Sequence, residues 1–112
     1  MKKIILLIFI SVLLVGCNKE SNNKPDIKNI ISNSEYKIID VRTEEEYKIE
    51  HIKDSINIPV NEIENIELDK NITILVYCKS GNRSKIAYNT LKSMGFRVYD
   101  LGAYNEIDLP KE

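Results

Sequence analysis

Residues 72–84, with the sequence ITILVYCKSGNRS, join an apolar run to a short polar turn. The run at 72–77 consists of aliphatic, β-branched and aromatic residues, which predicts a strand buried on both faces of a parallel sheet. The turn that follows it contains Lys79, Ser80, Gly81 and Asn82. From Arg83 onward apolar residues recur at spacings near 3.6, which predicts a helix. Cys78 is therefore expected at the carboxyl end of a strand, in a tight loop before a helix N-terminus.

This position favours a reactive thiolate at Cys78. The first turn of a helix leaves backbone N–H groups unpaired and carries a partial positive charge, which stabilises an anion. Such an environment lowers the pKa of a cysteine from ~8.5 toward neutrality. Arg83, five positions later, adds a permanent cation with donors suited to an oxyanion. We therefore prefer a nucleophile facing an anionic substrate over a small apolar cysteine at a strand end.

Four motifs together resemble the rhodanese (thiosulfate sulfurtransferase) family. The first is the loop at 78–84, which resembles the active-site loop of that family. The others are Ile39-Asp40-Val41-Arg42-Thr43 with Glu46-Tyr47, then His51-Ile52 followed by Ile56-Asn57-Ile58-Pro59, and finally Gly95-Phe96 leading through Val98 to Leu101-Gly102-Ala103-Tyr104. The resemblance spans about residues 26–110.

The resemblance implies double displacement at Cys78. The thiolate takes sulfur from a small anionic donor such as thiosulfate, and the resulting persulfide passes it to cyanide or another thiol. Backbone N–H groups of residues 79–83 are expected to hold the persulfide, while Arg83 orients the donor and Lys79 adds positive potential. Neither a metal nor an organic cofactor is expected. A protein partner is compatible with this scheme.

Two regions depart from the family pattern. Glu50 stands before His51 where the family has a glycine, so the local turn is open to question, and His51 is left out of the mechanism. Near the C-terminus, Gly102-Ala103 and Ile107 stand where the family often has two glycines and a tryptophan. These residues are small or apolar, so we expect repacking rather than loss of the fold.

The remaining residues predict a single α/β domain at 26–110. Strands are expected at 36–41, 56–58 and 97–101, and helical segments at 27–31, where Asp26 is the cap, and at 61–66. Thr43 and Glu46 form a capping-box pattern for a helix through about Glu50. This alternation predicts an open parallel sheet flanked by helices, with its site at the strand carboxyl ends. Asp40 and Arg42 border that site, and we expect them to support the loop.

The N-terminal residues predict a lipoprotein signal peptide at 1–16. Two lysines precede an apolar run at 4–15, which is too short for a stable transmembrane helix. The run ends in Leu14-Val15-Gly16-Cys17, which resembles the lipobox of bacterial lipoproteins and implies lipidation of Cys17. Residues 17–25 then form a lipidated tether, placing the domain outside the cytoplasm in the cell envelope. An ordinary signal peptide or an uncleaved anchor is the alternative.

Composition excludes several other classes of function. The 112 residues carry a net charge of −1, which argues against nucleic-acid binding. One histidine and two cysteines are too few for a structural zinc site.

A thiol phosphatase or arsenate reductase shares the strand, cysteine and arginine plan, but four residues between Cys78 and Arg83 leave little room for a tetrahedral oxyanion. A persulfide carrier or binding module would use the same residues as the enzyme.

Overall fold

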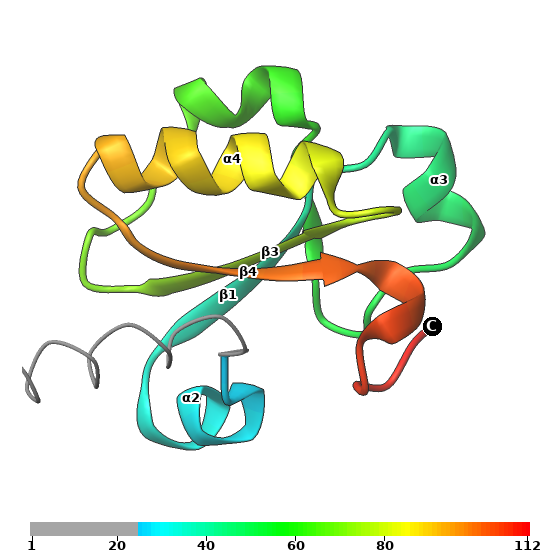
Figure 1. Ribbon diagram of the computed structural model, residues 1–112, viewed down its shortest axis with the longest axis horizontal. Coiled ribbons are helices and arrows are strands. Elements are labelled where there is room, and N and C mark those ends of the chain that lie inside the picture. The colour runs from blue at the N-terminus through cyan, green and yellow to red at the C-terminus, as the bar shows by residue number, and fades with distance from the viewer. Residues whose placement is uncertain (1–24) are drawn as a thin grey trace, which may run out of the picture.

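A computed structural model describes residues 25–112, and its centre is a four-stranded parallel sheet (Figure 1). The strands are β1 (Tyr36–Asp40), β2 (Ile56–Asn57), β3 (Thr73–Cys78) and β4 (Arg97–Ala103). Their order is β2-β1-β3-β4, and every neighbouring pair is parallel. The expected open parallel sheet is confirmed, and β3 lies in its interior between β1 and β4.

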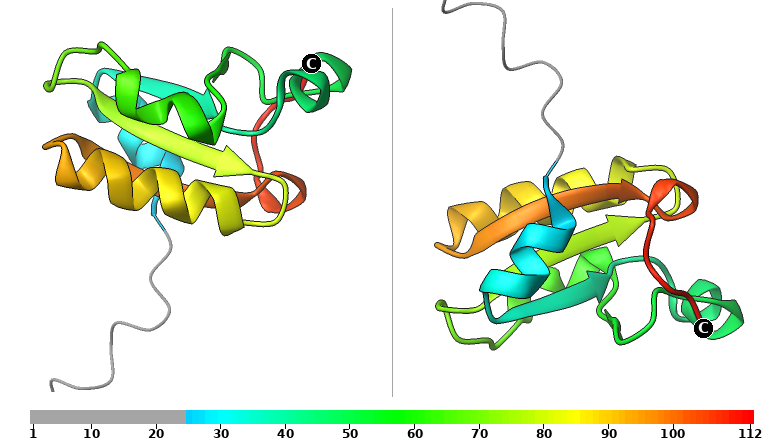
Figure 2. Two further views of the ribbon diagram at one scale, coloured as in Figure 1. Left: turned by 90° about the horizontal axis from the view of Figure 1, so that it is seen from above. Right: turned by 90° about the horizontal axis from the view of Figure 1, so that it is seen from below.

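Helices cover both faces of the sheet, as the views from above and below show (Figure 2). One face carries α4 (Asn82–Ser93) and the 3-10 helix η3 (Val60–Asn65), while α2 (Ile27–Asn33) crosses the other. The short helix α3 (Glu44–Ile49) and the 3-10 turn η4 (Tyr104–Glu106) lie at the carboxyl ends of the strands (Figure 1). Among residues 25–112, no helix combines the length and apolarity needed to span a bilayer.

Strand β3 is buried along its whole length, because its side chains alternate between two apolar clusters. Ile74, Val76 and Cys78 pack with α4 and η3, whereas Leu75 and Tyr77 pack on the opposite face. All five are 0% exposed. The unbroken apolar run thus reflects a strand covered on both sides, as predicted.

Two glycines set the ends of α4. Gly81 precedes it at φ +102°, a left-handed conformation that other residues rarely adopt. Gly95 follows it at φ +99°, and the N–H groups of Gly95 and Phe96 donate to the carbonyl oxygens of Lys92 and Leu91. This Schellman arrangement satisfies the last helical carbonyls and turns the chain into β4.

Several boundaries differ slightly from the sequence-based expectations. Helix α2 runs two residues past Ile31, β4 continues to Ala103, and the helical turn expected at 61–66 is a 3-10 helix. The predicted signal peptide at 1–16 and Cys17 lie outside the described residues, as does all of the predicted tether except Pro25.

Candidate active site

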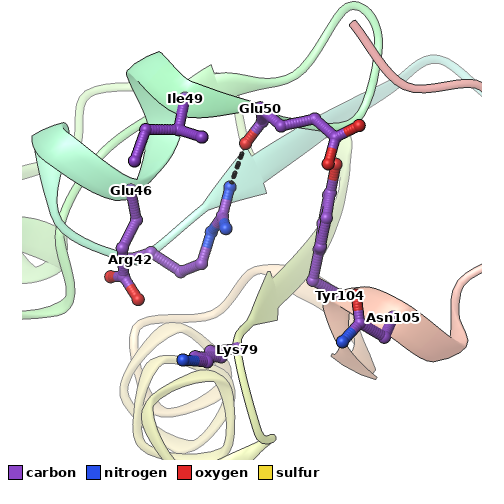
Figure 3. Close-up of a pocket in the computed structure, with 7 residues that line it drawn as sticks. All are labelled: Arg42, Glu46, Ile49, Glu50, Lys79, Tyr104 and Asn105. Atoms are coloured by element: carbon purple, nitrogen blue, oxygen red, sulfur yellow. Dashed lines mark hydrogen bonds between the residues drawn. The ribbon is translucent and has the colours of Figure 1, made fainter.

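The site lies where β1, β3 and β4 end, beside the first turn of α4. Their last residues, Asp40, Cys78 and Ala103, meet at one edge of the sheet. A cavity of about 180 Å³ opens there, and Figure 3 shows its lining side chains around the Arg42 guanidinium. The cavity is lined by Arg42, Glu46, Ile49, Glu50, Lys79, Tyr104 and Asn105. The placement follows the rule that parallel α/β sheets carry their sites at strand carboxyl ends.

Cys78 is held in a nest of hydrogen-bond donors. Its side chain is 0% exposed, and Sγ accepts a hydrogen bond from the Gly81 N–H at 3.0 Å. Burial alone would raise the pKa of the thiol, but the Ser84 hydroxyl and the N–H groups of Ser84, Gly81 and Ser80 lower it below its ordinary value. Because these donors stabilise only the charged form, the loop favours the thiolate.

Ser84 is a site residue that the sequence analysis did not single out. It is 0% exposed in the first turn of α4, and its hydroxyl donates to the Gly81 carbonyl oxygen at 3.2 Å. The same hydroxyl helps to lower the pKa of Cys78. A hydroxyl carries one proton, so Ser84 donates either to the Gly81 carbonyl oxygen or, after rotation, to the thiolate. Its signal in the sequence is its place as the last residue of the 78–84 motif.

Arg83 does not point freely toward a donor in this structure, because it is paired with Glu46 of α3. Its Nη1 and Nη2 donate to the Glu46 carboxylate at 2.8 and 3.2 Å. Glu46 also completes the predicted capping box, in which it accepts from the Thr43 N–H at 2.9 Å. The predicted capping box is confirmed, and the ion pair with Arg83 gives Glu46 a second role. Hydrogen bonds from Arg83 lower the pKa of Glu46 to about 2, and the same pair raises the pKa of Arg83.

The Glu46 pair makes stability dependent on pH in the acid range. Since the pKa of Glu46 falls from 4.5 to about 2 on folding, its stabilisation is present above pH 4.5 and is lost between pH 4.5 and 2. We expect Glu46→Gln, which keeps the capping pattern, to cost about 0.5–1 kcal/mol at pH 6 because the pair is partly exposed. Urea unfolding of both proteins from pH 6 to 2 measures this difference. If the two proteins differ by the same free energy of unfolding at every pH from 6 to 2, the Arg83–Glu46 ion pair does not contribute as proposed.

Asp40 and Arg42 form a buried ion pair behind the loop. Arg42 Nε and Nη2 donate to the Asp40 carboxylate at 2.9 and 2.7 Å, and the Tyr77 hydroxyl donates to the same carboxylate at 2.7 Å. Arg42 Nη2 also donates to the Glu50 carbonyl oxygen at 2.7 Å, and the guanidinium carbon lies 4.6 Å from the centre of the Tyr104 ring. Since Tyr77 directly precedes Cys78, this network anchors the strand that carries the thiol.

The other predicted loop residues face outward. Lys79, Ser80 and Asn82 are exposed, Lys79 lines the cavity, and Asn82 is the first residue of α4. Ser80 contributes through its backbone, as one of the N–H groups that lower the pKa of Cys78. Among residues 25–112, no group of three or more histidine, cysteine or acidic side chains could hold a metal ion.

The departures from the family pattern at Glu50 and Ile107 are accommodated without strain. Glu50 has φ −168°, an extended conformation open to any residue, so a glycine is not needed there. His51 stacks on Tyr47 with ring centres 3.7 Å apart and does not line the cavity. Ile107 is 4% exposed and packs in the cluster that contains Tyr77.

Comparison with known proteins agrees with this geometry. The Rhodanese-like domain family matches residues 23–108. Thiosulfate sulfurtransferase PspE of Escherichia coli is 42% identical over 78 residues, which cover 65% of this chain and 75% of PspE. The putative sulfur carrier protein YrkF of Bacillus subtilis is 39% identical over 72 residues, 62% of this chain but only 39% of YrkF.

Solved structures show the same relationship. A rhodanese with anions from E. coli superposes with a TM-score of 0.65 at 38% identity, covering 69% of this chain and 96% of that protein. A rhodanese-related protein from Thermoplasma volcanium gives a TM-score of 0.62 at 30% identity, covering 72% and 81%. At the level of the family, these relatives support sulfurtransferase chemistry. Fold, site and sequence together show that the chain belongs to the rhodanese-like family.

Proposed function

We propose that this domain is a sulfurtransferase in which Cys78 carries sulfur from a small anionic donor, such as thiosulfate, to a thiol or cyanide. The observation that carries the proposal is the position of the Cys78 Sγ. It lies 3.0 Å from the Gly81 nitrogen, in a loop that lowers the pKa of the thiol. A thiolate at neutral pH is the nucleophile that such a transfer requires.

The proposed reaction has two steps. The Cys78 thiolate attacks the outer sulfur of thiosulfate, a sulfur–sulfur bond forms, and sulfite leaves with the electron pair of the broken bond. Cyanide or a thiolate then attacks the terminal sulfur of the persulfide, and Cys78 leaves as a thiolate. The N–H groups of Ser80, Gly81 and Ser84 that lower the pKa of Cys78 are placed to stabilise the negative charge at both stages. The cycle balances without a metal or an organic cofactor.

Intact mass spectrometry tests the covalent step directly. The full chain carrying Cys17→Ser is expected to gain one sulfur atom, ~32 Da, after thiosulfate treatment, and to lose it on addition of cyanide. The matched protein that also carries Cys78→Ser should gain nothing. An unchanged mass of a protein whose Cys78 is still free for alkylation would count against thiosulfate as donor.

A persulfide carrier is a second candidate, favoured by the similarity to the putative sulfur carrier protein YrkF. A carrier also forms the Cys78 persulfide, but it delivers sulfur to a partner protein and turns over slowly with small acceptors. Steady-state thiocyanate formation separates the two. Repeated turnover indicates an enzyme, whereas one equivalent of thiocyanate per chain indicates a carrier.

We also propose that Cys17 is lipidated, so that the domain is held at the membrane on the extracytoplasmic side of a bacterial cell envelope. The support is the sequence Leu14-Val15-Gly16-Cys17 after an apolar run. Two or more acyl chains would anchor a domain of this size stably. Labelling cells with an alkyne fatty acid should mark the wild-type chain and leave a Cys17→Ser variant unmarked.

A further inference from the structure

The Arg83–Glu46 pair bears on which donors the site accepts. We propose that Glu46 is a specificity-determining residue, which neutralises Arg83 and so favours sulfur donors with one negative charge over the dianion thiosulfate. This inference rests on the proposed function and concerns the same site. Its starting point is that both terminal nitrogens of Arg83 donate to Glu46, at 2.8 and 3.2 Å.

Arg83 is the cation of the loop that holds the reacting sulfur. It lies in the first turn of α4, two residues after Gly81, whose N–H donates to the Cys78 Sγ at 3.0 Å. The Cys78 thiolate and the Glu46 carboxylate both raise the pKa of Arg83. A donor anion that binds Arg83 must therefore share it with Glu46 or displace the Glu46 carboxylate. The carboxylate is fixed in place by the Thr43 N–H, which donates to it at 2.9 Å.

The other charges around the cavity do not replace the positive charge of Arg83 that Glu46 neutralises. Arg42 and Lys79 line the cavity together with Glu46 and Glu50, so the lining carries two positive and two negative side chains. Arg42 is already neutralised by Asp40, which accepts from it at 2.7 Å. The Arg42–Asp40 and Arg83–Glu46 pairs are each close to neutral, so a dianion meets the Glu50 carboxylate with Lys79 as the one lining cation that has no ion-pair partner among the described residues.

A pair of donors that differ by one charge isolates this effect. Thiosulfate carries two negative charges and methanethiosulfonate carries one, and both present a terminal sulfur bonded to an oxidised sulfur. The Cys78 thiolate attacks that terminal sulfur in each case. Sulfite leaves from the first donor and methanesulfinate from the second, so the bonds formed and broken are alike. The ratio of kcat/KM values for the two donors, with cyanide as acceptor, reports the charge preference.

Two variants separate the charge of Glu46 from its role as a cap. Glu46→Gln keeps a side chain that satisfies the capping box but removes the charge. Thr43→Ala removes the reciprocal cap but keeps Glu46 charged, and it serves as the matched control. Both are compared as the full chain, with unfolding midpoints recorded to show that each protein is folded.

We expect Glu46→Gln to raise kcat/KM for thiosulfate about tenfold and to change the value for methanethiosulfonate less than about threefold, because the Coulomb energy with a nearby charge is about twice as large for a dianion as for a monoanion. Adding Arg83→Gln to Glu46→Gln should return the thiosulfate value to within about threefold of wild type. Thr43→Ala should lower the unfolding midpoint and leave the donor ratio unchanged.

Two results would overturn the proposal: a donor ratio in Glu46→Gln within about twofold of wild type, or an equal shift of the ratio in Thr43→Ala. If the proposed sulfurtransferase function itself is wrong, the experiment gives another result. In that case neither donor adds sulfur to Cys78 in the intact mass of the wild-type chain, and no ratio can be measured.

Discussion

Cys78→Ser is expected to lower thiocyanate formation from thiosulfate and cyanide by about a thousandfold or more. Serine keeps the size of the side chain but is not ionised at neutral pH, so the donors around Sγ have no thiolate to stabilise. Colorimetric detection of thiocyanate over a range of enzyme concentrations measures the loss. Cys17→Ser is the matched control and should retain wild-type turnover.

The expected loss depends on Cys78 and not on damage to the fold. Since Cys78 is completely buried, the serine variant must be shown to be folded by its unfolding midpoint. A folded Cys78→Ser protein with more than a tenth of wild-type activity would rule out a Cys78 persulfide as the obligatory intermediate.

Asp40→Asn is expected to have the largest effect on stability, at about 3 kcal/mol. Asp40 is 0% exposed and accepts from Arg42 and Tyr77, so the amide would leave the Arg42 charge buried without its counter-ion. The free energy of unfolding in urea measures the cost, with an unchanged m-value as the sign that the transition stays two-state.

The double variant Asp40→Asn with Arg42→Gln tests this reason. Removing both charges removes the uncompensated ion, so the double variant should be more stable than Asp40→Asn alone. If the double variant is the less stable of the two, the destabilisation comes from lost hydrogen bonds to Asp40 and not from the stranded charge.

The features that the sequence predicted well are encoded over short distances along the chain. The run at 72–77 specifies β3 because each face of the strand is apolar, and Thr43 and Glu46 specify the start of α3 because they cap each other within one turn. Asp40 and Arg42 are two positions apart and pair with each other, while their predicted support of the loop stays a prediction.

The contacts that the sequence did not predict join residues 37 positions apart. Arg83 meets Glu46 and Tyr77 meets Asp40 only because β1 and β3 lie side by side, with β2 and η3 intervening in the chain. Spacing cannot specify such a partner, since several acidic residues near the strand ends could have faced Arg83. This is why Arg83 was predicted to bind a donor anion directly, without a carboxylate already in place.

The central position of β3 also determines when during folding Cys78 becomes buried. β3 must pair with β1 on one side and with β4 on the other, and both are parallel pairings that require long crossovers. Such non-local contacts form late, after the entropy of closing the intervening chain has been overcome. The donors that lower the pKa of Cys78 lie within six residues of it, so they do not depend on these pairings. The burial of Cys78 does depend on them, so a chain still folding exposes the thiol to solvent and only the native state covers it.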